Sequence, residues 1–298
     1  MISSADLALS AAKTNSESIY YSFFDTQLNL ETQERKLLQE GLVEALNSGR
    51  FELYYQPCFD LQGDALKEVQ TLARVRKHDG SEMSSTELFS TAEKAHLLPR
   101  INRWIFETSC RQAARWKRKG MNVPGLTFQL SHLQFSDSSF IRFVKRILSE
   151  TGIAAEDIAF QIAKSELDGP DKNRETFITE IKSLGAKLIL DQVGNSLSNL
   201  DELRKYAFDQ INLSSNTIRE IDGGKGDLKS IGILIEMAHK LDAVAMAKSI
   251  ETEEQFDRLK LAGCDLGQGP FLSEELTAKQ VEDVLWKNSE NNPLHFIT

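Results

Sequence analysis

The chain has 298 residues, of which 41% are hydrophobic, and it carries a formal net charge of −9. This length and composition allow one large domain with a substantial buried core, or two small domains. The acidic balance and the lack of a clustered basic face exclude nucleic acid as an expected partner, because phosphate binding needs grouped Lys and Arg side chains.

Cysteine usage and the chain's apolar runs indicate a cytoplasmic setting. Cys58, Cys110 and Cys264 are widely spaced and odd in number, which favours free thiols over a disulfide framework or a zinc motif. No basic stretch followed by an apolar run marks a signal peptide. No apolar run approaches the roughly 20 residues that cross a bilayer. We therefore expect no membrane contact in this chain.

The predicted elements begin with an N-terminal extension and continue as a repeating pattern. Ala5–Lys13 predicts a short helix, Ile19–Phe24 a short strand, and residues 27–48 one polar helix. From Arg50 onward, strand-like runs alternate with helical patterns. The expected strands are Phe51–Phe59, Val69–Val75, Leu126–Leu130, Ile158–Ile162, Lys187–Leu190, Phe208–Leu213, Ala243–Ala247 and a short run near Asp265. The expected helices include Ile101–Lys119, Ser138–Thr151, Asn173–Leu184, Leu228–Leu241 and Glu251–Ala262.

Eight strands that alternate with helices over about 230 residues favour an α/β fold, a (β/α)8 TIM-like barrel. A doubly wound open sheet is the competing arrangement. In such barrels the functional mouth lies at the C-terminal ends of the strands. The polar side chains expected at these ends are Gln70, Gln129, Gln161, Lys164, Asp191, Gln192, Asn212 and Lys248.

Several motifs follow one another in a specific order and spacing. They are FELYYQP at Phe51–Pro57, CRQAARW at Cys110–Trp116, LSHLQF at Leu130–Phe135, SLGAKLILD at Ser183–Asp191, IETEEQ at Ile250–Gln255 and GCDLGQG at Gly263–Gly269. Together they resemble the bacterial EAL domain, a family of cyclic di-GMP phosphodiesterases, across Leu42–Leu276. Residues 4–26 are similar to the end of a GGDEF domain, with a simple helical extension as the alternative. We expect residues 1–41 to form this extension with a linker helix, and residues 42–298 to form the EAL-like barrel.

The resemblance places the family's catalytic and metal-binding positions on residues of different chemistry. The Glu-Ala-Leu triplet falls on Gln70, Thr71 and Leu72, and the metal-binding Asn falls on Gln129. Two acids of the next segment fall on Gln161 and Lys164, and the paired aspartates on Asp191 and Gln192. The catalytic lysine falls on Asn212 and a late glutamate on Lys248.

These replacements argue against metal-assisted hydrolysis. Two divalent ions need several carboxylates, because Mg²⁺ and Mn²⁺ prefer charged oxygen ligands. Amides are poor substitutes, and an ammonium group repels a cation. We therefore expect no catalytic residues, no Mg²⁺ or Mn²⁺ cofactor and no enzyme activity. Lys164 and Lys248 are expected to take over the charge role of the ions beside Asp191, with solvent exposure of both lysines as the alternative.

Part of the family's ligand pocket matches in residue type. The ligand-binding candidates are Gln56, Leu72, Arg74, Asp79, Asp191 and Gln268. The guanidinium of Arg74 suits a phosphate, with an internal ion pair at the barrel rim as the alternative. Ser273, Glu274 and Glu275 stand where the family often has Gly-Arg-Pro, and they add negative charge where an anionic dinucleotide would pass.

The sequence therefore predicts an inactive EAL-like signalling module that acts through protein–protein contacts and is modulated by cyclic di-GMP. The alternative is a non-hydrolysing cyclic di-GMP receptor that binds the dinucleotide in the barrel mouth. The resemblance also implies a homodimer. The sequence names no protein partner.

Overall fold

The structure is a computed structural model, and it describes residues 26–63, 65–77, 79–167, 171–194, 200–219 and 228–289. The packing of the chain divides it into two compact units. One unit holds the described residues up to Glu52 together with Arg74–Leu98, and the other holds Leu53–Ala73 and the described residues from Pro99 onward. The predicted elements Ala5–Lys13 and Ile19–Phe24 lie outside the described residues.

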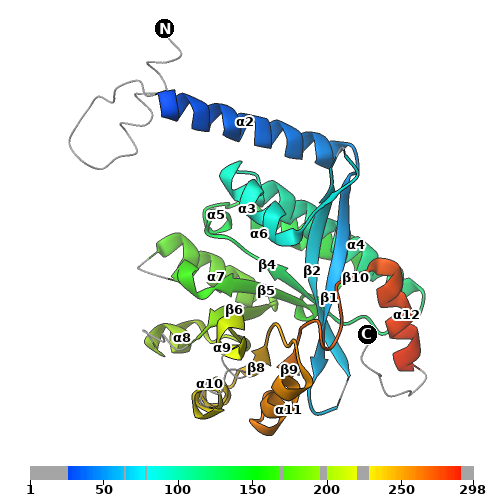
Figure 1. Cartoon of the computed structure of the whole chain (residues 1–298), viewed down its shortest axis with the longest axis vertical. Helices are drawn as coiled ribbons and strands as arrows, with labels where there is room; N and C mark the ends of the chain where they lie inside the picture. Colours follow the sequence, from blue (N-terminus) through cyan, green and yellow to red (C-terminus); the bar gives the residue numbers. More distant parts are fainter. Residues whose placement is uncertain are drawn as a thin grey trace, which may run out of the picture. The chain divides into compact units, whose positions relative to one another are not determined.

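The larger unit contains a closed barrel of eight strands (Figure 1). Neighbouring strands follow the order β1-β9-β8-β7-β6-β5-β4-β2, and a pairing between β1 and β2 closes the ring. The strands are β1 (Phe51–Asp60), β2 (Leu66–Arg76), β4 (Gly125–Gln129), β5 (Ile158–Ala163), β6 (Lys187–Val193), β7 (Gln210–Leu213), β8 (Val244–Ala247) and β9 (Leu266–Gly267). The predicted TIM-like barrel of the EAL type is confirmed.

The first strand differs from the rest in direction. Strand β1 pairs antiparallel with β9, whereas the pairs from β2 through β4, β5, β6, β7 and β8 to β9 are all parallel. Only five residues separate the end of β1 at Asp60 from the start of β2 at Leu66. Such a tight connection suits antiparallel strands, because parallel strands need a long crossover. A short strand, β10 (Leu276–Thr277), adds to β1 on its outer edge.

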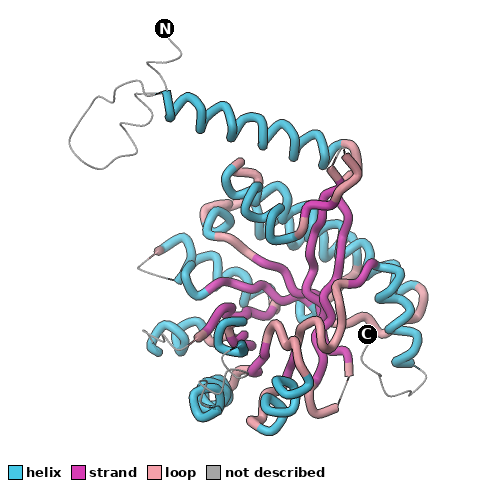
Figure 2. The backbone as a smooth tube through the Cα atoms, viewed as in Figure 1, coloured by secondary structure: helices cyan, strands magenta, loops and turns pink. Residues whose placement is uncertain are grey.

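Helices connect the parallel strands, as the alternating pattern predicts. In Figure 2 the helices of this unit, in cyan, lie outside its magenta strands. They are α4 (Leu98–Arg118), α5 (His132–Phe135), α6 (Phe140–Thr151), α7 (Lys172–Leu184), α8 (Leu200–Tyr206), α9 (Ser215–Arg219), α10 (Leu228–Lys240), α11 (Glu253–Leu261) and α12 (Ala278–Ser289), with 3-10 turns η1 (Ala155–Asp157) and η2 (Lys164–Leu167). The expected helix Glu251–Ala262 is two residues shorter at its start, because Thr252 caps it by accepting a hydrogen bond from the Gln255 backbone.

The core between helices and barrel is built largely from aromatic rings. Phe106 of α4 lies 4.8 Å from Phe128 of β4 and 5.8 Å from Phe160 of β5, measured between ring centroids. Tyr55 of β1 packs against Trp116 of α4 at 5.1 Å. The apolar stripe of α4 is buried as its spacing predicts, with Ile101, Ile105, Cys110, Ala113 and Trp116 each at most 4% exposed.

The smaller unit is described by itself. It contains α2 (Thr26–Asn47), α3 (Ser85–Lys94), the two-residue strand β3 (Glu82–Met83) and the adjoining ends of β1 and β2. Helix α2 contacts α3 and buries Leu42 and Ala45, while Leu37 is exposed. An ion pair joins Arg76 to Glu52 at 2.8 Å.

Two expectations from composition can be compared with the described residues. Within them, no helix is long and apolar enough to cross a membrane. Cys58, Cys110 and Cys264 are buried free thiols. Burial raises the pKa of the Cys110 and Cys264 thiols to about 12, so neither is a reactive thiolate at neutral pH.

Candidate functional site

The polar side chains of the barrel interior follow from the two-residue period of the strands. On β2, Glu68, Gln70 and Leu72 share one face, because alternate residues Val69, Thr71 and Ala73 are buried on the other face. The parallel strands carry their C-terminal ends to one rim of the barrel. The predicted polar positions therefore converge at this rim, which we call the mouth.

An ion pair lies at the centre of the mouth. Lys248 directly follows β8, and its ammonium Nζ is 2.9 Å from Oδ1 of Asp191 in β6. Only 15% of the Lys248 side chain and 5% of the Asp191 side chain is exposed. In a setting shielded from water an unpaired charge would be costly, so each group provides the other with a partner of opposite charge. Of the two lysines expected to pair with Asp191, Lys248 does so.

Three amide side chains extend this ion pair into a network. Asn212 of β7 donates from Nδ2 to Asp191 Oδ1 at 3.0 Å and to Gln161 Oε1 at 3.2 Å. The same Gln161 oxygen accepts from Lys248 Nζ at 3.1 Å. Gln161 in turn donates to Gln129 Oε1 at 2.5 Å, across the register pair that joins β4 and β5. Four of the predicted mouth residues besides Lys248 thus form one hydrogen-bonded unit, which we call the Lys248 network (Gln129, Gln161, Asp191, Asn212 and Lys248).

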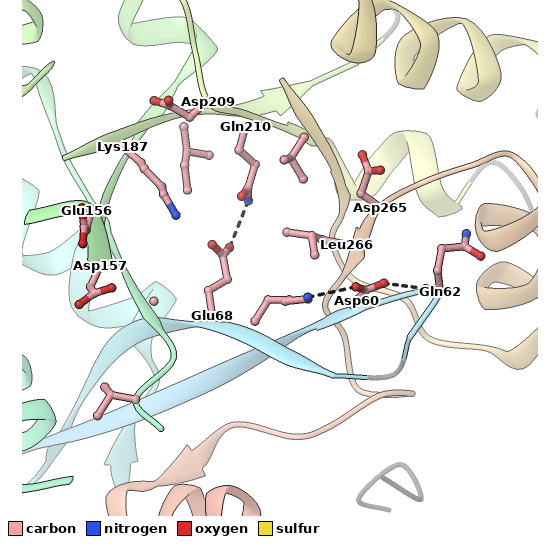
Figure 3. A pocket seen from close by; sticks show the side chains of 15 residues that line it. Asp60, Gln62, Glu68, Glu156, Asp157, Lys187, Asp209, Gln210, Asp265 and Leu266 are labelled. Atoms are coloured by element: carbon pink, nitrogen blue, oxygen red, sulfur yellow. Dashed lines mark hydrogen bonds and ion pairs between the residues drawn. The ribbon is translucent and has the colours of Figure 1, made fainter. Parts of the chain in front are cut away.

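Two residues outside the predicted set continue this network toward the opposite end of the barrel. Gln210 donates from Nε2 to Asn212 Oδ1 at 2.9 Å and to Glu68 Oε1 at 3.1 Å, and only 6% of Gln210 is exposed. Figure 3 shows Glu68 and Gln210 pointing toward each other, joined by a dashed line. Burial raises the pKa of Glu68, and the hydrogen bond from Gln210 opposes that rise.

The alternation of the strands carries a signal for both missed residues. Glu68 lies two positions before Gln70, and Gln210 lies two positions before Asn212, so each shares an inward face with a predicted mouth residue. The prediction followed only the ends of the strands, and therefore overlooked polar side chains one layer deeper.

Three other predicted positions lie near the mouth without a role in these contacts. Gln192 is exposed, and its backbone is left-handed, with a φ of 63°, at an irregularity in the β6–β7 pairing. The bulge turns Gln192 outward while Asp191 stays buried. Gln70 is half-buried on the inner face of β2, and Lys164 is half-buried at the start of η2.

The ligand-binding candidates of the larger unit are engaged with the barrel itself. Gln56 of β1 donates from Nε2 to the Ser273 carbonyl at 2.8 Å, and Gln268 donates to the Gln56 carbonyl at 3.3 Å. Gln268 is 5% exposed, whereas Leu72 is half-buried on β2. These contacts fix the wall of the barrel on the side of β1, and they leave the ligand role of these residues as a prediction.

Arg74 and Asp79 belong to the smaller unit and have partners there. Arg74 Nη1 lies 3.3 Å from Glu82 Oε2, an ion pair in which both side chains are about a third exposed. Asp79 Oδ1 accepts from the backbone and the hydroxyl of Ser81, and these bonds hold the pKa of Asp79 below its usual range. The role of both residues toward a nucleotide stays a prediction.

The donor chemistry of the mouth does not fit a pair of divalent metal ions. Asp191 is the carboxylate of the network, and its Oδ1 already accepts from Lys248 and Asn212. A unit charge 4 Å away is worth about 4 kcal/mol at an effective dielectric near 20, and a divalent ion would feel about twice that repulsion from the Lys248 ammonium. Among the described residues, no three His, Cys, Asp or Glu side chains are grouped to hold a metal ion.

Comparisons with known proteins identify the family to which this closed barrel with one reversed strand belongs. The family model described as "EAL domain" matches residues 39–275, about four-fifths of the chain. The chain belongs to the EAL domain family.

Curated relatives match almost the whole chain at low identity. "Uncharacterized protein y4lL" of Sinorhizobium fredii is 27% identical over 291 residues, which cover 97% of this chain and 34% of that protein. "Bifunctional diguanylate cyclase/cyclic di-GMP phosphodiesterase MucR" of Pseudomonas aeruginosa is 23% identical over 93% of this chain and 40% of that protein. The chain spans about a third of the length of several curated relatives that it matches.

Solved structures share the fold. "PaMucR Phosphodiesterase, c-di-GMP complex" matches with a TM-score of 0.77 and 22% identity, covering 82% of this chain and 99% of that chain. The EAL domain of Xanthomonas citri FimX, solved "in complex with c-diGMP", matches with a TM-score of 0.75 and 23% identity, covering 84% and 97%. At this level of identity the likeness establishes the architecture of the barrel.

Proposed function

We propose that this chain is an EAL signalling module that does not hydrolyse cyclic di-GMP and acts through protein–protein contacts. The observation that carries the proposal is the ion pair of Lys248 and Asp191, surrounded by the amides of Gln129, Gln161 and Asn212. An ammonium group occupies the centre of the mouth and satisfies the carboxylate beside it. The proposal places the module in the bacterial cytoplasm.

Without metal ions, the mouth lacks a group that activates the attacking water and enough positive charge to neutralise the transferred phosphate. Two-metal hydrolysis lowers the pKa of a water and neutralises the transferred phosphate at the same time. The Lys248 ammonium can neutralise part of the charge on a phosphate. Unlike a metal ion, it does not bind a water molecule and lower the pKa of that water, so it does not generate the attacking hydroxide. Asp191 has its Oδ1 engaged by two donors, so it is a weak candidate for a general base.

A contact role is supported by the electrostatics of the mouth. The paired charges of Lys248 and Asp191 cancel, so the network offers little net attraction to a dinucleotide with two phosphates. Arg74, the candidate phosphate ligand, is paired with Glu82, and binding a phosphate would require that pair to open. A barrel kept intact by internal contacts can still present its surface to a protein partner.

The second candidate is a receptor that binds cyclic di-GMP without cleaving it. It is supported by the family-type residues Gln56, Leu72, Arg74, Asp79 and Gln268, and by relatives whose structures are titled as complexes with c-di-GMP. If the chain is such a receptor, bound cyclic di-GMP would also modulate the protein–protein contacts proposed above. Self-association as a homodimer is part of the same proposal.

A hydrolysis assay tests the absence of phosphodiesterase activity. The full chain is incubated with cyclic di-GMP in Mn²⁺ and in Mg²⁺ buffer, with an active EAL phosphodiesterase as the positive control, and the products are separated by chromatography. We expect no linear dinucleotide beyond the level of a protein-free blank. Linear product that disappears on addition of a chelator would overturn the proposal.

Calorimetry decides between the two candidates. Cyclic di-GMP is titrated into the wild-type chain and into Arg74→Ala, with Arg76→Ala as the matched control, since Arg76 is also ion-paired in the same unit. The absence of binding heat at high protein concentration supports the contact module. Micromolar binding that Arg74→Ala weakens, and Arg76→Ala does not, supports the receptor. Light scattering on the same samples reads the oligomeric state.

A further inference from the structure

A basic face lies on the outside of the larger unit, where helices α4 and α6 pack side by side. Phe106 of α4 and Phe143 of α6 mark this contact, with ring centroids 6.0 Å apart. Exposed cationic side chains follow one another at helical spacing on the outward side of each helix. We call this set the α4–α6 face (Arg111, Arg115, Arg118, Arg142, Lys145 and Arg146).

The charge of this face runs against the charge of the chain. The whole chain has a formal net charge of −9, whereas the acidic side chains that pair with the cations of the face, among the described residues, are Glu107 and Glu150. The sequence does not reveal the face, because its two halves are far apart in the chain and only the packing of the helices joins them. The expected lack of a clustered basic face is therefore wrong for this side of the barrel.

Glu150 shows which kind of group the face holds. Its Oε2 lies 3.3 Å from Nη2 of Arg111 on α4, and its Oε1 lies 2.8 Å from Nη1 of Arg146 on α6. We call this arrangement the Glu150 bridge. One carboxylate is thus held between guanidinium groups of both helices, in an arrangement that is open to solvent. The arginines of this face are therefore spaced to bind carboxylates, which suit the planar guanidinium group.

Two further contacts fix the direction of the helices. Arg103 of α4 donates to the hydroxyl of Ser139, just before α6, at 2.6 Å. Lys117, near the end of α4, donates to the carbonyl of Gly152, just after α6, at 3.3 Å. The two helices therefore run in the same direction, so early residues of α6 and late residues of α4 lie at opposite ends of the face.

The cations at these two ends have no acidic partner among the residues that the structure describes. Arg142 and Lys145 precede the Glu150 bridge along α6, and Arg115 and Arg118 follow it along α4. The distance from the first to the last of them is about 20 Å, because each helical residue adds about 1.5 Å. A ligand that pairs with both ends needs negative charge at two places this far apart.

The acids in the middle of the face distinguish between classes of ligand. A nucleic acid or an anionic membrane carries phosphates at regular intervals, so it would place some of them against Glu107 and Glu150, and like charges repel. A protein segment can place carboxylates at its ends and neutral residues between them. Phe143 adds a half-buried ring, with the Arg103 and Arg146 guanidinium groups 4.9 Å and 5.5 Å from its centroid. Arginine and aromatic side chains are enriched where proteins meet.

We propose that the α4–α6 face binds an acidic segment of a partner protein, with carboxylates at both ends of the segment. One end pairs with Arg142 and Lys145, and the other pairs with Arg115 and Arg118. The neutral middle of the segment lies over the Glu150 bridge. The inference rests on the contact function proposed above and names the chemistry of the partner.

Fluorescence anisotropy with two labelled peptides of the same composition tests the proposal. Each has about 14 residues, a helical length of about 20 Å, and one has Glu at both ends with Ala between, whereas the other has its Glu residues in the middle. At low ionic strength, the wild-type chain should bind the end-charged peptide saturably and the other peptide about threefold more weakly or less.

Paired variants locate the binding. The double change Arg118→Gln with Arg142→Gln, one at each end of the face, should weaken binding of the end-charged peptide about threefold or more, because exposed ion pairs are lost at both ends. The matched control, Arg204→Gln with Lys279→Gln, removes two exposed cations of α8 and α12 and should leave binding unchanged.

A variant of opposite sign probes the middle of the face. Glu150→Gln removes the acid and frees the two arginines of the Glu150 bridge, so it should tighten binding of the middle-charged peptide several-fold. Glu236→Gln, which removes an ion-paired acid of α10, should not change it. Equal effects of these two changes would contradict the proposal.

Other results would also overturn the proposal. One is the absence of saturable binding up to about 1 mM peptide. Equal weakening by the two double variants would indicate general attraction to positive charge. Tighter binding of oligothymidylate of the same charge, or of phosphatidylserine vesicles, would assign the face to nucleic acid or membrane. Self-association that Arg118→Gln with Arg142→Gln abolishes, read by light scattering, would assign it to a second copy of the chain. The assay contains no cyclic di-GMP, so its failure is distinguishable from a positive hydrolysis assay.

Discussion

The ammonium of Lys248 lies 2.9 Å from the carboxylate of Asp191, at a point of the barrel mouth where both side chains are largely shielded from water. Removal of either partner changes the electrostatics of the whole network, because Lys248 donates to Gln161, Asp191 accepts from Asn212, and Asn212 donates to Gln161. Variants of this pair should therefore differ from wild type in the free energy of unfolding, which can be measured without a ligand.

Replacing Lys248 with methionine should destabilise the fold. Lys248→Met keeps most of the side-chain volume but leaves Asp191 buried with Asn212 as its remaining donor from the network. Breaking a fully buried pair costs about 3–5 kcal/mol, and we expect a loss near or below that range because Lys248 is 15% exposed. Urea denaturation measures the change. Lys240→Met, at a surface ion pair, should shift stability by at most about 0.5 kcal/mol.

A double-mutant cycle isolates the pair itself. Asp191→Asn alone leaves the ammonium with Gln161 as an acceptor, and the combination with Lys248→Met should cost less than the sum of the single changes. Additive costs would mean that the two groups do not interact in solution.

The pH dependence of stability should report on Glu68. Because its folded pKa is raised above the ordinary value of 4.5, its favourable contribution is fully present below pH 4.5 and is lost as the pH rises through the folded pKa. At neutral pH the ionised group opposes folding. Glu68→Gln should therefore be more stable than wild type at pH 7, with a difference that shrinks at low pH, as thermal unfolding at several pH values would show.

Asp137 provides a control of opposite sign. Its burial alone would raise the pKa, but hydrogen bonds from Arg103 and Ser139 lower it overall. Its stabilising contribution is therefore present at neutral pH and lost as the pH falls through the folded pKa. Asp137→Asn should be less stable than wild type at pH 7. If both variants shift in the same direction, the assignment of Glu68 is wrong.

The Gln210 side chain should stabilise the barrel interior, because it donates hydrogen bonds both to Asn212 near the mouth and to Glu68 toward the opposite end. Gln210→Leu leaves the Asn212 side-chain oxygen and one Glu68 oxygen without their shared donor. An unsatisfied buried polar group costs about 1–3 kcal/mol, so we expect a loss of that order in chemical denaturation. Gln62→Leu, at an exposed amide, should stay within about 0.5 kcal/mol of wild type. Equal effects of the two changes would contradict a structural role for Gln210.

A charge reversal should create a weak affinity for metal. Lys248→Glu places a second carboxylate beside Asp191, and like charges at this distance destabilise the metal-free fold. Added Mn²⁺ should then raise the melting temperature of the variant but leave wild type unchanged. Ligand at tenfold its dissociation constant stabilises by about 1.4 kcal/mol. An equal rise in both proteins would indicate metal binding elsewhere.

The sequence carried enough information for the barrel and for five residues of the mouth, Gln129, Gln161, Asp191, Asn212 and Lys248. The apolar period of two located the strands, and the placement of Lys248 directly after β8 put its ammonium within reach of Asp191. The pattern did not reveal that β1 is antiparallel to its neighbours, because the alternation of apolar and polar residues is the same in parallel and antiparallel strands. Helices α3 and α12 were also not singled out.

Other features depend on side-chain geometry that no local pattern encodes. Gln192 was expected beside Asp191 in the mouth, but the bulge of β6 turns it outward. Lys164 and Lys248 have similar chemistry in the sequence, and the three-dimensional positions of η2 and β8 distinguish them. The deeper pair of Glu68 and Gln210 required the register between strands that are far apart in the chain.

Electron paramagnetic resonance of Mn²⁺ tests most directly whether an ammonium group has taken the place of metal in the mouth. The wild-type chain and Asp191→Asn are titrated with Mn²⁺, and the signal of the hydrated ion gives the concentration of free Mn²⁺. We predict superimposable curves, with weak binding to surface acids alone. A site in wild type that takes up one or two ions per chain and is lost in Asp191→Asn would contradict the account.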